Sequence, residues 1–229
     1  MPSKNKKNYV SIPLKVRKHL TDEQISKLST GHLYRMRSRR TIRNFSEREI
    51  SAKVIEDCIR VASLAPSGAN QQPWHFCMIS DPMVKNKIRC AAEREERKFY
   101  NSEKNHEWLN ALEPLGTDAD KPHLEMAPWL IVVFSERYGQ APNGQKTKNY
   151  YVPESVGIAT GFLISALHLS GLYCLTHTPS PMGFLQNICN RPTSNRATLI
   201  IAVGHAAKNA TYPSAATIKK PLNKILSVF

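Results

Sequence analysis

Three arginines and a threonine lie close together near residue 40, and they form the group best suited to bind an anion. They are Arg39, Arg40, Thr41 and Arg43. A planar guanidinium makes bidentate hydrogen bonds to a phosphate, and arginine holds this geometry better than lysine does. A basic run that only faced water would not carry Ile42 and Phe45. We interpret the cluster as a cradle for a phosphorylated cofactor. The alternative, a basic helix end in solvent, fits these residues alone equally well.

Two further segments have residue types that can line a site. The loop 65–74 reads APSGANQQPW, and its prolines and glycine predict a tight turn whose backbone N–H groups and Ser67 hydroxyl can face a ligand. Thr176, His177 and Thr178 end the strand predicted for 173–178 and precede Pro179. Hydroxyls at a strand end often line a site. The alternative for the loop 65–74 is a plain turn, and the alternative for the strand end is a capped turn.

The long charged pattern at 83–103 predicts a helix with a candidate pair on one face. Glu96 and Tyr100 are four residues apart and therefore share that face. The region from about 92 to 123, which includes Lys121, has few apolar residues for its length. We interpret it as a lid that orders over a ligand. The usual alternative for such a charged pair is a solvated surface.

The chain of 229 residues carries a formal net charge of +14, and the charge is unevenly distributed. Residues 1–50 hold thirteen Lys or Arg against four Asp or Glu, and no acidic residue follows Glu154. This balance suits phosphate, nucleic acid or an anionic membrane surface. Nucleic acid is disfavoured, because the sequence has no helix-turn-helix, zinc-finger or aromatic RNA-binding pattern.

The five cysteines are scattered without a C-x-x-C pair, which indicates a reducing compartment and not a disulfide framework. No His pair has metal-ligand spacing. The amino end has no apolar core region of a signal peptide.

The uncharged segment 156–175 is about as long as a bilayer is thick. Polar residues interrupt it, so we favour a buried helix in the core or a dimer interface, where Gly157 and Gly161 allow close approach.

The remaining pattern predicts one mixed α+β domain. A basic arm covers 1–18, and a single domain covers 19–229. Helices are expected from Thr21 to about residue 37, from Ser51 to about 65, over 83–103, over 108–112 and from about 151. Strands are expected at 75–80, 129–134, 173–178 and 198–203.

These motifs together resemble the FMN-dependent nitroreductase superfamily, and within it the iodotyrosine deiodinase subfamily. RRTIRNFS followed by APSGA and PW is the superfamily signature. The subfamily signal is Glu96 with Tyr100 and Lys121, together with GTDADKPHLEMAPWLIVVF, NYYVPESVGIATG and LTHTPSPM. The resemblance runs from about Pro13 to the carboxyl end. It implies a nitroreductase-like FMN-binding fold, with a mixed sheet flanked by helices, in a domain-swapped homodimer.

The resemblance also implies roles for individual residues. The residues that would bind FMN are Arg39, Arg40, Thr41, Arg43, Pro66, Ser67, Gly68, Thr176, His177, Thr178 and Lys219. The Thr178 hydroxyl would lie near flavin N5 and favour one-electron chemistry. Lys219 stands where the family commonly has arginine, and Asn70 where vertebrate members tend to have histidine. Glu96 would hold the ammonium of a halotyrosine, Tyr100 and Lys121 its carboxylate, and the Ala69 N–H would face its phenolate.

The implied activity is reductive removal of halide from a halotyrosine with electrons from FMN. No G-x-G-x-x-G motif for a nicotinamide cofactor is present, so a separate reductase or transient NAD(P)H binding would supply the electrons. Two alternatives stay open: a general flavin nitroreductase, and a non-enzymatic flavin-fold protein that regulates a partner. The chain as given is expected to be cytoplasmic, or membrane-tethered if an amino-terminal anchor was removed.

Overall fold

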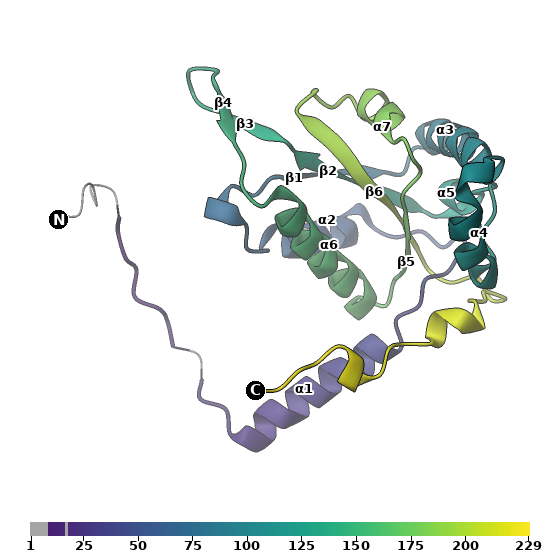
Figure 1. Cartoon of the computed structure of the whole chain (residues 1–229). Coiled ribbons are helices and arrows are strands. Elements are labelled where there is room, and N and C mark those ends of the chain that lie inside the picture. The colour runs from purple at the N-terminus through teal and green to yellow at the C-terminus, as the bar shows by residue number, and fades with distance from the viewer. Residues whose placement is uncertain (1–8, 17) are drawn as a thin grey trace. The chain divides into compact units, whose positions relative to one another are not determined.

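The computed structural model describes residues 9–16 and 18–229, and the chain falls into two compact units, Met1–Ser38 and Arg39–Phe229. In the first unit, helix α1 spans Asp22–Arg37 (Figure 1). It begins directly after Thr21, as the sequence predicts, and Thr21 forms a capping box with Gln24. The predicted basic arm lies partly outside the described residues, and its boundary after residue 18 stays a prediction.

The second unit is built on a four-stranded sheet in the order β1-β2-β6-β5 (Figure 1). The strands are β1 (Trp74–Ile79), β2 (Trp129–Glu136), β5 (Tyr173–His177) and β6 (Asn195–Gly204). Each adjacent pair is antiparallel. The short strands β3 (Tyr138–Gln140) and β4 (Lys146–Lys148) pair separately as a hairpin, which the sequence analysis did not predict.

Helices cover both faces of the sheet. They are α2 (Ala52–Ser63), α3 (Pro82–Tyr100), α4 (His106–Leu112), α5 (His123–Met126), α6 (Val152–Leu169) and α7 (Gly183–Ile188). α2, α3, α4 and α6 lie where the sequence predicts helices. The two shortest, α5 and α7, were missed because four to six residues give too little periodicity.

Successive side chains of β2 point to opposite faces of the sheet, so the core forms two layers. Leu130, Val132 and Phe134 belong to a cluster with residues of α3, α5 and α7. Ile131 and Val133 belong to a second cluster with residues of α2 and α6. Because both faces of the strand are covered, the sequence of β2 reads as a continuous apolar run.

Helix α6 explains the long uncharged segment of the sequence. By length and composition it is the one helix among the described residues that could cross a membrane. Its residues Val156, Leu163 and Leu167 pack onto the sheet, as expected for a core helix. A Cβ built at Gly157 or Gly161 would meet nothing within 4 Å. The close approach predicted at these glycines is therefore not made within the described part of the chain.

We predict that Leu163→Ala lowers the free energy of unfolding by about 2–5 kcal/mol, because it opens a cavity beneath α6. Leu163 is fully buried. Chemical denaturation followed by circular dichroism measures the change. Met83→Ala, at an exposed position of α3, is the control and should change the value by less than about 0.5 kcal/mol. Equal effects of the two substitutions would contradict this packing.

Candidate active site

A pocket of about 180 Å³ lies beside the carboxyl end of β5. Its walls come from the segment after Arg39, the last turns of α3, α4, the segment before α5, and β5. The residues that line it are Thr41, Arg43, Glu96, Phe99, Tyr100, Trp108, Leu112, Thr117, Lys121, His123, Leu175, Thr176, His177, Thr178 and Ser180. Most of the polar residues that the sequence analysis singled out therefore meet in one place.

Glu96 and Lys121, which both line this pocket, form an ion pair. A Glu96 carboxylate oxygen lies 3.2 Å from Lys121 Nζ, and the side chains are 14% and 7% exposed. The Lys121 ammonium also donates to the Asp118 carbonyl. The alternative interpretation of Glu96 as a solvated surface residue is therefore wrong. The pair presents one anion and one cation side by side, both largely shielded from solvent.

A second carboxylate fixes the backbone that carries Lys121. The Lys121 N–H donates to Glu93 Oε1 at 2.8 Å. Arg89 and Arg97 also contact the Glu93 carboxylate, at 2.8 and 3.3 Å. Burial acts to raise the pKa of Glu93, but these donors outweigh burial and hold the pKa below its usual value. Glu93 therefore stays ionised and anchors the lysine segment to α3.

Tyr100 lies on the same face of α3 as Glu96, as its spacing predicts. Its hydroxyl donates to Thr117 Oγ1 at 2.8 Å. Lys121 Nζ lies 5.4 Å from the centre of its ring. Burial raises the pKa of Tyr100, so the phenol keeps its proton and can donate a hydrogen bond.

Two histidines with buried Nε2 atoms line the pocket. The rings of His123 and His177 meet edge to face with their centres 6.0 Å apart. The Nε2 atom of each is buried and has no hydrogen-bond partner among the described residues. His177 Nε2 lies 3.7 Å from Glu96 Oε1. Burial, aided by the Lys121 cation, lowers the pKa of His123 to about 4 and that of His177 to about 3. Both rings are neutral near pH 7, and both can still accept a ligand contact.

The arginine cradle is divided between this pocket and its surroundings. Ile42 and Phe45 are buried in the core, so the interpretation of this segment as a solvated helix end is wrong. Thr41 and Arg43 line the pocket, and Arg39 Nη1 lies 3.5 Å from Thr41 Oγ1. Arg43 also lines a second cavity, of about 430 Å³, together with Tyr212. The Arg40 guanidinium lies over the Tyr212 ring, 5.2 Å from its centre.

The loop 66–69 lies elsewhere, against the start of α6. The Gly68 N–H donates to Ser155 Oγ at 3.2 Å. A Cβ at Gly68 would lie 2.5 Å from the Tyr150 carbonyl oxygen, so only glycine fits this approach. Ala69 has a φ of 50°, in the left-handed region. Seven of the predicted site residues are not among the described residues that line the pocket. They are Arg39, Arg40, Pro66, Ser67, Gly68, Ala69 and Lys219.

Several lining residues were missed by sequence reasoning. His123 lies two residues after Lys121, and Phe99 and Trp108 are aromatic residues in a polar stretch. The rings of Phe99 and Trp108 meet edge to face, 4.9 Å apart, and form an apolar wall. The aromatic residues within the predicted lid were the sequence feature that could have identified these lining residues.

Comparison with known proteins identifies the class. Residues 36–205 match the model of the nitroreductase family. The chain therefore belongs to the nitroreductase family, and the predicted α+β, nitroreductase-like fold is confirmed.

Relatives of this chain within that family include proteins named iodotyrosine deiodinase. The protein of that name from Haliscomenobacter hydrossis is 53% identical over 84% of this chain and 86% of its own length. Human iodotyrosine deiodinase 1 is 37% identical over 91% of this chain and 72% of its own length. A crystal structure of oxidised iodotyrosine deiodinase bound to FMN and 3-iodo-L-tyrosine superposes with a TM-score of 0.69. It is 30% identical and covers 86% of this chain and 98% of that one.

The buried histidines predict a pH dependence of stability. Their folded-state pKa values lie below the unfolded value of about 6.5, so the unfolded chain binds more protons as the pH falls. The stability that they contribute is complete above about pH 6.5 and declines toward pH 4. The melting temperature measured by calorimetry should therefore fall over that window, and the slope should be shallower for His123→Phe. The exposed His106→Gln is the control; identical slopes in all three proteins would contradict the burial argument.

Proposed function

We propose that this protein is an FMN-dependent iodotyrosine deiodinase that removes halide reductively from halotyrosines. The observation that carries the proposal is the Glu96–Lys121 pair, with Tyr100, in a pocket at the end of β5. The relatives with this name, and the related structure with FMN and 3-iodo-L-tyrosine bound, support it.

The pocket is complementary to an amino acid zwitterion. The Glu96 carboxylate would accept from the substrate ammonium, and the Lys121 ammonium and the Tyr100 hydroxyl would donate to its carboxylate. In the free protein Glu96 and Lys121 neutralise each other at 3.2 Å. Binding would exchange this single ion pair for two, so neither buried charge is left unpaired.

The donor set next to this pair suits FMN. The Arg43 guanidinium and the Thr41 hydroxyl are phosphate and ribityl donors, and Thr176, His177 and Thr178 would face the ring system. The buried Nε2 atoms of His123 and His177 lack protein partners in the described part of the chain, as expected where a polar ligand completes the site. When bound, FMN supplies the electrons that cleave the carbon–halogen bond.

The aromatic wall would cover the substrate ring and exclude water. Phe99, Trp108 and Leu112 line the pocket together with Glu96. An apolar cover strengthens the charge contacts beneath it because it lowers the local dielectric constant. In this proposal the predicted lid, at about 92–123, holds the ring of the substrate. The ion pairs hold the ammonium and the carboxylate of the substrate.

We propose further that the working enzyme is a homodimer. The pocket of about 180 Å³ is smaller than the roughly 300–1,000 Å³ of typical ligand sites, and the loop 66–69 does not reach it within one chain. A second copy would supply this loop, including the Ala69 N–H that the family resemblance places near the substrate phenolate.

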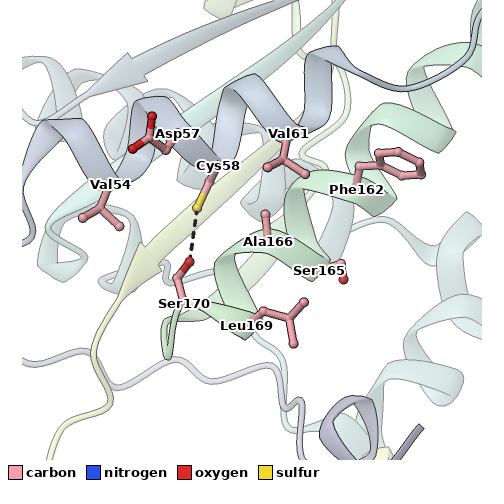
Figure 2. Close-up of a pocket in the computed structure, with 9 residues that line it drawn as sticks. All are labelled: Val54, Asp57, Cys58, Val61, Phe162, Ser165, Ala166, Leu169 and Ser170. Carbon is pink, nitrogen blue, oxygen red and sulfur yellow. Dashed lines mark hydrogen bonds between the residues drawn. The ribbon is translucent and has the colours of Figure 1, made fainter. Parts of the chain in front are cut away.

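An apolar groove on the opposite side of the sheet is suited to hold that second copy. It lies between α2 and α6, where Figure 2 draws the residues that line it. Its volume is about 740 Å³. Val61, Phe162 and Leu169 line it and stay 41–48% exposed. Cys58 and Ser170 meet at its base, 3.8 Å apart. Burial of this face in a dimer would also use the open side of Gly157 and Gly161.

The electron donor is a separate reductase or transiently bound NAD(P)H. The sequence has no dinucleotide-binding glycine motif of its own.

Iodide release from 3-iodo-L-tyrosine, driven by dithionite and measured with an iodide-selective electrode, tests the proposed activity without a named reductase. An FMN-loaded protein that reduces nitroaromatics but releases no iodide would contradict it and indicate a general nitroreductase.

Substitutions of the ion pair provide the specific prediction. Glu96→Gln and Lys121→Met should each raise KM for 3-iodo-L-tyrosine about 10- to 100-fold, because each removes a charge-assisted contact worth about 1.5–3 kcal/mol. The Kd for FMN should stay within about twofold. Lys98→Met, an exposed charge on the same helix, is the matched control. Unchanged KM in both ion-pair variants would show that the zwitterion binds elsewhere.

The dimer is tested by Phe162→Asp. This change places a charge in the apolar groove and should convert a dimer to a monomer in analytical ultracentrifugation, with loss of FMN affinity. Met83→Asp, at an exposed site of α3, should stay dimeric. A monomeric wild-type protein that binds FMN tightly would rule the proposal out.

A further inference from the structure

The loop 66–72 has an unfavourable backbone conformation that its surroundings must hold in place. Ala69, Asn70 and Gln72 have φ values of 50°, 53° and 49°, all in the left-handed region. Asparagine tolerates this region, but the Cβ of alanine or glutamine makes it costly. Residues in such conformations persist only where neighbouring contacts fix them, and they cluster at sites that bind ligands. The contacts that fix this loop therefore bear on its function.

The side chain of Gln71 supplies two of these contacts. Its Nε2 donates to the Lys148 carbonyl at 2.8 Å, and its Oε1 accepts from the Tyr150 N–H at 2.7 Å. Gly68 approaches the same segment, because a Cβ built there would lie 2.5 Å from the Tyr150 carbonyl oxygen. The loop is therefore held against residues 148–150 on both sides of Ala69.

The segment 148–150 is itself fixed to the sheets. Lys148 is the last residue of β4, which pairs with β3. Asn149 Nδ2 donates to the Glu136 carbonyl at 2.8 Å, and Glu136 is the last residue of β2. The Gln71 amide thus connects a strained loop to a rigid part of the molecule, although 77 and 79 positions separate it from its two partners.

The hydrogen bonds of the loop leave one backbone donor free. Within residues 68–72, the N–H groups that donate to acceptors in the chain, at 2.9 to 3.2 Å, are those of Gly68, Asn70, Gln71 and Gln72. The Ala69 N–H has no acceptor among the residues that the structure describes, and Ala69 is exposed. A fixed and unpaired N–H can donate to an oxyanion without rearrangement.

We propose that Gln71 is a positioning residue, which holds the Ala69 N–H in place to donate to the phenolate oxygen of the halotyrosine. The inference rests on the proposed function, in which a second copy brings this loop to the pocket. Gln71 itself does not touch the substrate. A hydrogen bond to a phenolate is charge-assisted and depends on geometry. Gln71 therefore sets the preference for ligands that carry the phenolate and leaves the rest of the binding energy unchanged.

A pair of ligands that differ only in the hydroxyl tests this role. The FMN-loaded protein is titrated with 3-iodo-L-tyrosine and with 3-iodo-L-phenylalanine, while flavin fluorescence is recorded. The wild type should bind the tyrosine about tenfold or more tightly than the phenylalanine. In Gln71→Ala the ratio should fall to about twofold or less, with the Kd for 3-iodo-L-phenylalanine within about twofold of the wild type. Equal weakening of both ligands would indicate a merely structural role and overturn the proposal.

Two further variants sharpen the result. Gln145→Ala removes the same side chain from an exposed position of the β3–β4 hairpin, and its ratio should equal that of the wild type. Gln71→Glu keeps an acceptor for the Tyr150 N–H but places an oxygen against the Lys148 carbonyl, so its ratio should fall as in Gln71→Ala. If Gln71→Ala fails to fold, Gln71→Glu decides. A wild-type ratio in the Gln71 variants would refute the proposal.

Hydrogen–deuterium exchange separates this inference from the proposed function because it needs no halotyrosine. In Gln71→Ala the peptide 66–73 should lose protection, and the peptide 129–136, which covers β2, should keep it. Unchanged exchange of the peptide 66–73 would refute Gln71 as the residue that holds the loop. A wild-type protein that binds FMN but ignores 3-iodo-L-tyrosine would instead refute the proposed function, and with it the phenolate as the ligand of Ala69.

Discussion

The ion pair between Glu96 and Lys121 is the interaction on which the pocket depends. Two largely buried charges are costly to desolvate, and removal of either partner leaves the other uncompensated at a cost of about 3–5 kcal/mol. The protein keeps the pair in place through Glu93, which holds the Lys121 backbone and is itself held by Arg89 and Arg97. A chain that needed only stability would be as well served by apolar residues here. The pair is therefore best explained by a ligand that separates the charges and binds one with each end.

The sheet sets where this ligand lies. Because helices cover both faces, β5 reaches the pocket from a rigid core, and its last residues face the charged end of α3. The loop 66–69 is fixed just as firmly, but to Ser155 and Tyr150 at the start of α6. Under the proposed function, the loop and the pocket are two halves of one site that do not meet within the described part of one chain, and the apolar groove between α2 and α6 could join two chains. The proposed dimer accounts for both features.

Sequence patterns predicted the parts of this arrangement that depend on local spacing. Glu96 and Tyr100 share a face because helices repeat every 3.6 residues, and the apolar run of β2 predicted a strand covered on both sides. Contacts between distant segments could not be read in this way. The Glu96–Lys121 pair and the edge-to-face contact between the rings of His123 and His177 each join residues that no short-range pattern connects. The family resemblance grouped the loop 66–69 with the cradle, whereas its position in one chain is set by packing against α6.

Recognition of the zwitterion is the central claim, and it is tested most directly with matched ligands. The FMN-loaded protein is titrated with 3-iodo-L-tyrosine and with the analogue that lacks the amino group, 3-(4-hydroxy-3-iodophenyl)propanoate, while flavin fluorescence is recorded. The account predicts saturable quenching by the amino acid, and an affinity for the analogue weaker by about tenfold or more, because Glu96 would then face no cation. Equal affinity for the two ligands would contradict it.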